Sequence, residues 1–171
     1  MWAPTTSCGA RTPSGTGHRR HRSWRSARSR SHPSCRNGTN GDERIIGTDG
    51  HDEIHGKGGL DAVEGNDGND RIFGEAGEDH LFGRGDDDRI SGGDGNDEIQ
   101  GADGNDDITG GAGIDDITGG KDADEIDGGS GDDTIHAIGG GTDTIDCGPG
   151  RDRIKRDSND KVKNCEVFLD G

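Results

Sequence analysis

Aspartate recurs at every ninth residue through most of this chain, and that spacing is the feature most able to do chemistry. Thirteen positions follow the period, and twelve of them are Asp. A regular column of carboxylates either repels itself or holds cations, because each side chain brings both negative charge and oxygen ligands. The column consists of Glu43, Asp52, Asp61, Asp70, Asp79, Asp88, Asp97, Asp106, Asp115, Asp124, Asp133, Asp143 and Asp152.

These carboxylates belong to a nine-residue repeat, in which they hold position six. Eleven units run without a gap from Gly38 to His136, and two degenerate units follow one extra residue, Ala137. Position eight is aliphatic in all thirteen units, and position four is Gly except at Asp86 and Asp122. Random low complexity would supply Gly and Asp but not an aliphatic residue at each ninth place. A disordered acidic tract is therefore the weaker alternative.

Each repeat position predicts a piece of local structure. Positions seven to nine, such as Asp116, Ile117 and Thr118, predict a three-residue strand with one side chain turned inward. Positions one to six are rich in Gly and predict a turn, where positive φ and close approach between coils require glycine. One strand and one turn cannot close a sheet alone, so successive strands must alternate between two faces. The predicted fold class is all-β: a right-handed parallel β-roll, that is, a β-solenoid with two nonapeptide repeats per coil.

The composition excludes an ordinary globular enzyme core. Leu, Ile, Val and Phe number 23 of 171 residues, below the roughly 20% under which a highly charged chain is expected to stay disordered. Residues 38–171 carry 12 basic and 36 acidic side chains, a net charge of −24. Such a field repels nucleic acid and anionic membranes and attracts cations. No run of 18 apolar residues occurs, so no membrane-spanning helix is predicted.

Stacked coils would need cations between their turns. Aspartates of every second unit would lie about 4.8 Å apart along one edge and would repel one another. Two of them could neutralise one divalent ion while turn carbonyls complete a shell of oxygen atoms, which favours Ca²⁺ over Zn²⁺, copper and Mg²⁺. Because the apolar content is so small, we expect an unfolded metal-free chain that folds on binding several Ca²⁺ ions.

These units resemble the haemolysin-type calcium-binding repeat, the RTX nonapeptide G-G-x-G-x-D-x-U-x, over residues 38–155. The resemblance implies ions between turns two repeats apart. One turn would offer the carbonyls of positions two and four and its Asp, and the next turn the carbonyls of positions one and three and its Asp. A representative site implied in this way consists of Gly93, Gly95, Asp97, Gly110, Ala112 and Asp115. The carboxylates implied as ligands are Asp52, Asp61, Asp70, Asp79, Asp88, Asp97, Asp106, Asp115, Asp124, Asp133 and Asp143.

Departures from the pattern predict a difference between the two edges. Asp86 and Asp122 replace the position-four Gly of units six and ten, which both lie on the even edge. The best-ordered ions are therefore expected on the odd edge, with Glu43 starting that edge weakly. Ala137 is expected to disturb the register before Asp143. The odd-edge carboxylates are Asp61, Asp79, Asp97, Asp115 and Asp133.

The two ends have their own compositions. Residues 1–37 contain eight Arg and no Asp, Glu or Lys, which predicts a disordered Arg/Ser-rich tail. A nucleic-acid arm, a transit segment and translated non-coding sequence are the alternatives. Residues 156–171 are expected to cap the open end, with a last strand within 160–168. A bridge between Cys147 and Cys165 is expected and would suit an oxidising compartment, without a part for Cys8 and Cys35; four free thiols are the alternative.

Other constellations indicate little chemistry. No nucleophile occurs with a paired base, so no enzymatic activity is expected. The histidines hold different repeat positions, which favours solvated surface over a zinc site. These histidines are His51, His55, His80 and His136.

The sequence thus favours a non-enzymatic, calcium-binding roll that is monomeric and extracellular. Two alternatives remain open. The roll is either the detached C-terminal part of a secreted toxin or hydrolase, or an adhesive surface module that uses Phe73 and Phe82 as an exposed aromatic pair.

Overall fold

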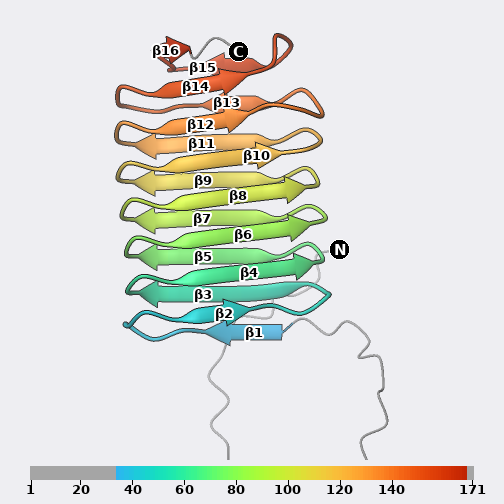
Figure 1. Ribbon diagram of the computed structural model, residues 1–171, viewed down its shortest axis with the longest axis vertical. Coiled ribbons are helices and arrows are strands. Elements are labelled where there is room, and N and C mark those ends of the chain that lie inside the picture. Colours follow the sequence, from blue (N-terminus) through green and yellow to red (C-terminus); the bar gives the residue numbers. More distant parts are fainter. Residues whose placement is uncertain (1–33, 169–171) are drawn as a thin grey trace, which may run out of the picture.

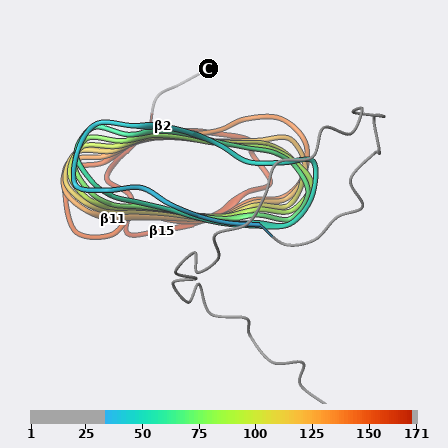
Figure 2. The same cartoon turned by 90° about the horizontal axis from the view of Figure 1, so that it is seen from below.

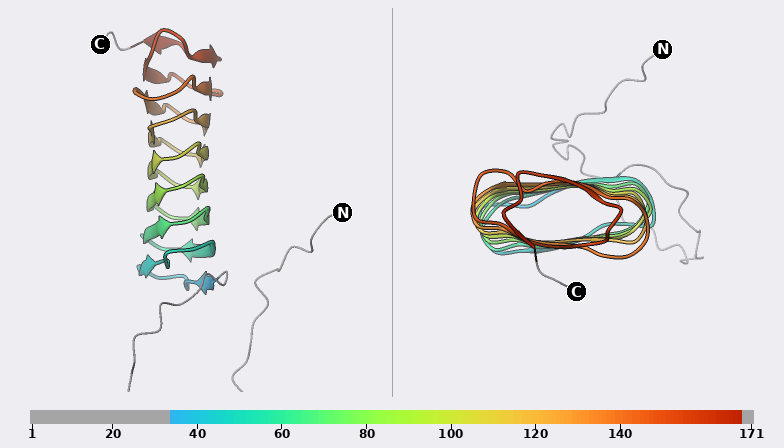
Figure 3. Two further views of the ribbon diagram at one scale, coloured as in Figure 1. Left: turned by 90° about the vertical axis from the view of Figure 1, so that its right-hand side faces the viewer. Right: turned by 90° about the horizontal axis from the view of Figure 1, so that it is seen from above.

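The structure, a computed structural model, describes residues 34–168, and in this range it consists of strands and turns without a helix. Sixteen strands form two parallel eight-stranded sheets, which face each other along a straight rod (Figures 1 and 3). The chain alternates between the sheets, so odd-numbered strands build one and even-numbered strands the other. The described residues include no helix long and apolar enough to cross a membrane.

The odd-numbered strands lie side by side in chain order. They are β1 (Ser34–Asn37), β3 (Asp52–Gly58), β5 (Arg71–Ala76), β7 (Arg89–Asp94), β9 (Asp107–Ala112), β11 (Glu125–Ser130), β13 (Thr144–Asp146) and β15 (Lys161–Lys163).

The even-numbered strands form the opposite sheet in the same way. They are β2 (Arg44–Ile46), β4 (Ala62–Asp67), β6 (His80–Gly85), β8 (Glu98–Asp103), β10 (Asp116–Gly120), β12 (Thr134–Ala137), β14 (Arg153–Arg156) and β16 (Val167–Phe168).

The register confirms two nonapeptides per coil. Ile72 of β5 pairs with Ile54 of β3 and with Ile90 of β7, each 18 residues away. Seen along the rod, successive coils superpose on one flattened oval whose long sides are the sheets and whose ends are the turns (Figure 2). The predicted β-solenoid is therefore the observed architecture.

The position-eight residues form the core, as two columns of aliphatic side chains that meet between the sheets. All from Ile54 to Ile154 are at most 1% exposed, while Ile45 and Val162 at the ends are partly buried. Each column continues from coil to coil through the strand register, for example Leu81 to Ile99 to Ile117. The core is thus two residues wide, and the coil ends must be filled by something other than apolar side chains.

The strands are longer than the three residues predicted. β7 continues through Gly92, Gly93 and Asp94, which are positions one to three of the next unit, so the turn is reduced to positions four to six. The reason lies at position one, where glycine is buried and continues the extended backbone. Positive φ is confined to positions two and four, as at Gly93 (117°) and Gly95 (135°).

The roll begins and ends beyond the predicted repeats. β1 pairs with β3 and starts at Ser34, four residues before the first repeat at Gly38; residues 1–33 of the predicted tail lie outside the described residues. At the other end, β15 pairs with β13 and β16 with β14. The predicted cap thus contains two further strands that continue the coils.

Ala137 does not disturb the columns as predicted. It is buried in the core, and the following strands pair at a separation of 19 rather than 18 residues, as in Glu125 with Thr144. The aliphatic column continues across this point, with Ile126 opposite Ile145. The next odd strand restores the balance, because Thr144 pairs with Lys161 at a separation of 17.

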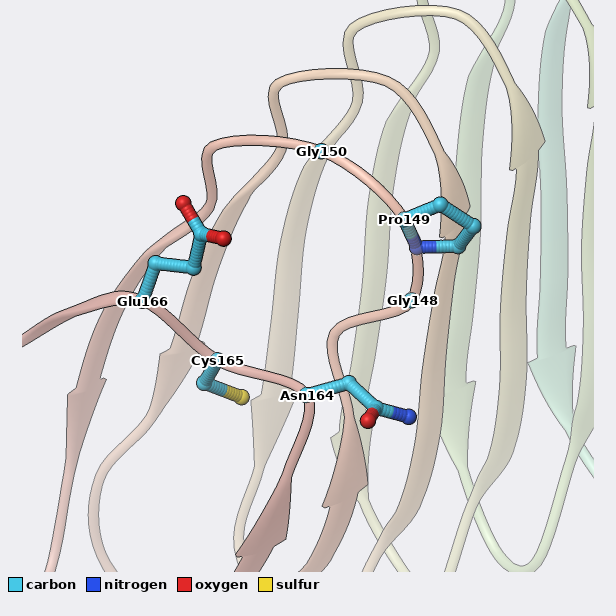
Figure 4. Close-up of a pocket in the computed structure, with 6 residues that line it drawn as sticks. All are labelled: Gly148, Pro149, Gly150, Asn164, Cys165 and Glu166. Carbon is cyan, nitrogen blue, oxygen red and sulfur yellow. The ribbon is translucent and has the colours of Figure 1, made fainter.

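Cys147 and Cys165 form the predicted disulfide, which joins two adjacent coils. Cys147 is fully buried and holds position one, where most units have Gly. A shallow hollow lies beside Cys165 (Figure 4), lined by Gly148, Pro149, Gly150, Asn164, Cys165 and Glu166. Cys35 is also disulfide-bonded, so the alternative of four free thiols is wrong.

Exchanging residues at position two should change stability in opposite directions. Ala102 holds this position at a φ of 92°, which is strained for a residue with a Cβ. Ala102→Gly should raise the free energy of unfolding by roughly 0.5–1 kcal/mol. Gly93→Ala should lower it, because a Cβ there would lie 2.1 Å from the carbonyl oxygen of Glu75. Denaturant unfolding measures both, and equal effects of the two variants would contradict this account.

Candidate metal centre

The position-six aspartates form two continuous ladders, one along each edge of the roll. Each backbone N–H donates to Oδ1 of the aspartate in the next coil of the same edge, with N···O distances of 2.7–3.0 Å. The odd edge runs from Glu43 to Asp152, and the even edge from Asp52 to Asp160. Aspartates of adjacent coils are therefore in direct contact, as the sequence predicted.

Strand alternation explains why these carboxylates lie inside the rod. Positions six, eight and one share one side of the extended backbone, so the aspartate faces inward with the aliphatic residue and the glycine. Between Asp52 and Asp152 the ladder side chains are at most 4% exposed. The ladders thus fill the two ends of the coil beyond the narrow apolar core.

Burial raises the pKa of most ladder aspartates, because it penalises the charged form. The pKa rises to about 8 at Asp88 and to about 7 at Asp70 and Asp124. Hydrogen bonds from backbone N–H groups lower the pKa in part, while neighbouring carboxylates raise it further. On the odd edge, Asp97 and Asp115 rise to about 6 by the same cause.

The second carboxylate oxygen of the ladder is left without a partner. Oδ1 accepts the N–H from the preceding coil, whereas Oδ2 is buried without any hydrogen bond at ten positions of the described chain. These positions are Asp61, Asp70, Asp79, Asp88, Asp97, Asp106, Asp115, Asp124, Asp133 and Asp152. A buried unpaired carboxylate oxygen is costly, so a column of ten indicates a missing positive partner.

Position-one glycine shapes the space in front of each free oxygen. A Cβ on Gly92 would lie 2.3 Å from Oδ2 of Asp97 and 2.5 Å from the carbonyl oxygen of Gly110 in the next coil. A Cβ on Gly110 would likewise lie 2.5 Å from Oδ2 of Asp115. The absent side chain therefore leaves a small cradle where a carboxylate oxygen and a carbonyl oxygen lie close together. This donor set consists of oxygen atoms alone, which fits a hard cation such as Ca²⁺.

The representative site of the sequence analysis falls within one pair of adjacent turns. Gly93 and Gly111 are paired, and the Asp97 N–H donates to Asp115. The carbonyl of Gly110 lies at the cradle, as just described. The Ala112 carbonyl accepts the N–H of Gly95 at 2.8 Å, so this oxygen already has one partner. The roles of these residues as ligands stay a prediction.

The ends of the ladders differ from their middles. Burial acts to raise the pKa of Asp52, but hydrogen bonds from Ser34 and Thr48 lower it overall. At the other end, the Asp157 N–H donates to Oδ2 of Asp160 at 2.7 Å. Glu43 is similarly satisfied by the backbone N–H and hydroxyl of Thr39. End carboxylates are thus completed by the protein itself, whereas most inner ones are not.

Two ladder residues were missed as candidate ligands by the sequence analysis. Asp152 holds position six of the last degenerate unit, and its Oδ2 is free. Asp160 ends the even ladder, but the unit before it is one residue short, which hides it from a strict nine-residue search. The signal that finds it is local: an Asp two residues before an aliphatic residue, here Val162.

A second, outer ladder was also missed. Asn or Asp at position five accepts the backbone N–H of position five in the next coil, as Asn96 does from Ile114 at 2.8 Å. Asp87 accepts from Asn105 in the same way, and Asn105 from Ala123. These side chains fix the turns outside the cradle and leave the inner carboxylates free.

The position-four replacements keep the turn conformation. Asp86 and Asp122 have φ values of 70° and 71°, in the same left-handed region as the glycines of this position. The predicted difference in ion order between the edges therefore has no support from a changed backbone, and it stays a prediction.

Side-chain clusters of other kinds are weaker. The described residues contain no group of three or more His, Cys, Asp and Glu side chains that could hold a metal. His55 lies between Glu75 at 2.8 Å and Glu53 at 3.4 Å. Phe73 stacks on His55, and Phe82 lies under the guanidinium of Arg84.

Phe73 and Phe82 do not form the exposed pair predicted from their spacing. Phe73 belongs to β5 and Phe82 to β6, which are in opposite sheets, and both side chains are half-buried. Consecutive units face opposite ways, so neighbouring position-nine residues cannot share a surface. The argument for an adhesive aromatic patch is thereby lost.

Comparison with known proteins agrees with this geometry. A search of curated proteins found no match. The family model of the RTX calcium-binding nonapeptide repeat matches residues 37–70, 55–90, 64–99, 82–117 and 100–135, which together span more than half of the chain. The chain belongs to the RTX calcium-binding nonapeptide repeat family.

Proposed function

We propose that this protein is a non-enzymatic calcium-binding roll whose folding depends on several Ca²⁺ ions held between adjacent turns. The observation that carries the proposal is the column of ten buried Oδ2 atoms without a hydrogen-bond partner. Each lies beside a position-one glycine and inside a turn rich in carbonyl oxygens. Membership of a calcium-binding repeat family supports the choice of ion.

The proposed ligands are the inner ladder aspartates with the carbonyls of their turns. For one site these are Asp97 and Asp115 with the carbonyls of Gly93, Gly95, Gly110 and Ala112. The same arrangement repeats at Asp52, Asp61, Asp70, Asp79, Asp88, Asp106, Asp124, Asp133 and Asp143. When bound, Ca²⁺ supplies the positive charge that lets neighbouring carboxylates stay ionised inside the roll.

The chain's own residues explain why folding would need the ion. The apolar core is only two aliphatic columns wide, so burial of hydrophobic surface is limited. The ladders bring like charges together out of water, which raises their pKa and favours protonation or unfolding. Without a cation, the folded roll at neutral pH must therefore hold carboxylates that are either protonated or repelling.

We further propose that the roll works as a monomer outside the cell. Extracellular calcium is plentiful, whereas the cell interior keeps it low, so a roll that needs many ions would fold only after export. The Cys147–Cys165 disulfide supports this location, because such bonds persist mainly in oxidising compartments.

Calcium should fold the chain. Circular dichroism of the purified protein, titrated with CaCl₂ after chelation, should change from a disordered to a sheet spectrum, and EGTA should reverse the change. The transition should be steep, because about ten ions bind together with folding. A sheet spectrum that is present before calcium and unchanged by EGTA would refute the proposal.

Filling one cradle should remove one site. Gly92→Ala places a Cβ 2.3 Å from Oδ2 of Asp97, so the calcium stoichiometry should fall by about one ion per chain and the folding midpoint should rise. Gly85→Ala is the matched control, since its Cβ would meet no atom closer than 3.6 Å and its φ is not positive. Isothermal titration calorimetry gives the stoichiometry. A control that loses as much calcium as Gly92→Ala would contradict the assignment.

Lower pH should weaken calcium binding. The ladder pKa values lie between about 6 and about 8 in the folded roll, above the ordinary value of 3.8. Protonation therefore favours the metal-free fold at low pH, and that contribution is lost as the pH rises through this range. Calcium must displace these protons, so the calcium midpoint should rise as the pH falls from 8 to 6. Titrations at fixed pH values measure it; a midpoint that is constant over this range would be inconsistent with buried ladder ligands.

A further inference from the structure

The basic residues of the roll are concentrated at its C-terminal end. Residues 38–171 contain 12 Lys and Arg, and half of them lie within 151–163, which we call the terminal basic coil. Its basic residues are Arg151, Arg153, Lys155, Arg156, Lys161 and Lys163. The preceding part of the roll, residues 38–150, contains 31 acidic and 6 basic side chains, a net charge of −25. The rod is therefore electrically polarised along its length.

The positive charges surround the end of the rod. Arg153 and Lys155 lie on β14, in the even-numbered sheet, and Lys161 lies on β15, in the opposite sheet. Arg151 belongs to the turn before β14. These strands are among the last of the rod, as the upper end of Figure 1 shows. Arg151, Arg153 and Lys161 are exposed, and Lys155 is half-exposed.

Little acidic surface offsets this charge. Asp152 and Asp160 belong to the buried ladders and face inward, which leaves Asp157 as the remaining carboxylate of the coil. Lys163 is paired with Asp146 at 2.7 Å. Arg151, Arg153, Lys155 and Lys161 form no ion pair with a carboxylate of the described range.

A covalent bond holds the coil in place. Cys147 and Cys165 enclose all six basic residues, and their disulfide joins the start of this coil to its end. Four unpaired cations in one coil repel one another, so the bond offsets a cost that calcium would not relieve there. Charge and covalent closure thus coincide in the same 19-residue segment, whose ends are 18 positions apart.

Calcium loading would decide which charge dominates. A metal-free chain carries the full net charge of −25 in residues 38–150 and is repelled by any anionic surface. About ten bound Ca²⁺ ions would reduce that charge to roughly −5. The terminal basic coil then becomes the strongly charged part of the molecule. This step rests on the proposed function.

We propose that the terminal basic coil is a docking surface for an anionic lipid bilayer, used end-on by the calcium-loaded roll. The four unpaired cations lie on both sheets and on a turn, so only a broad surface across the end of the rod can meet them together. The coil has no aromatic side chain for stacking bases, which disfavours single-stranded nucleic acid. Clusters of four to eight basic residues are a common means of binding anionic membranes.

Vesicle sedimentation tests the proposal with a pair of charge-matched variants. In the first variant, Arg151, Arg153, Lys155 and Lys161 are changed to Gln. In the control, four basic residues of the acidic part, Arg44, Arg71, Arg84 and Lys121, are changed to Gln, so that the net charge changes equally. The list of conditions is vesicles of phosphatidylcholine alone or mixed with phosphatidylglycerol, each with calcium or with EGTA.

The wild type and the control should bind phosphatidylglycerol vesicles in calcium and not in EGTA. The first variant should bind at least about tenfold more weakly. Equal binding by the two variants would overturn the inference, as would strong retention on heparin without vesicle binding. Circular dichroism of the same samples separates two failures. A folded roll that does not bind overturns this inference alone, whereas a chain that stays unfolded in calcium overturns the proposed function and this inference with it.

Discussion

The whole roll depends on how a buried aspartate divides its two oxygens. Oδ1 accepts a backbone N–H from the neighbouring coil and so fixes the register, while Oδ2 is left without a protein partner. In an ordinary core such an arrangement would be selected against, because an unpaired buried carboxylate is costly. Here it recurs at ten ladder positions. One oxygen therefore provides structure and the other provides the demand for a cation.

Much of this architecture could be predicted because the period is short and strict. One inward aliphatic residue per unit requires alternation between two faces, and that alternation determines the 18-residue register seen between Ile54 and Ile72. The same logic places Asp97 against Asp115. The disulfide also followed from its spacing, since Cys147 and Cys165 lie one coil apart.

What escaped prediction was mostly a matter of local geometry and of broken periods. The nine-residue pattern does not reveal that Gly92 continues a strand, because glycine signals a turn unless its neighbours are known. Asp160 was hidden by a shortened unit. Phe73 and Phe82 are close in sequence position, but alternation sends them to opposite sheets. Metal ligation by particular carbonyls cannot be predicted from the residue types, because every residue has a carbonyl.

The separations of 19 and then 17 residues around Ala137 have an evolutionary consequence. A gene for such a rod can gain or lose single codons within a loop without shifting the columns, provided that an aspartate and the aliphatic residue two places later stay together. The heritable building block is therefore the Asp-x-aliphatic triplet rather than the nonapeptide. Homologous rods can then diverge in loop length and outer charge while their interiors remain interchangeable.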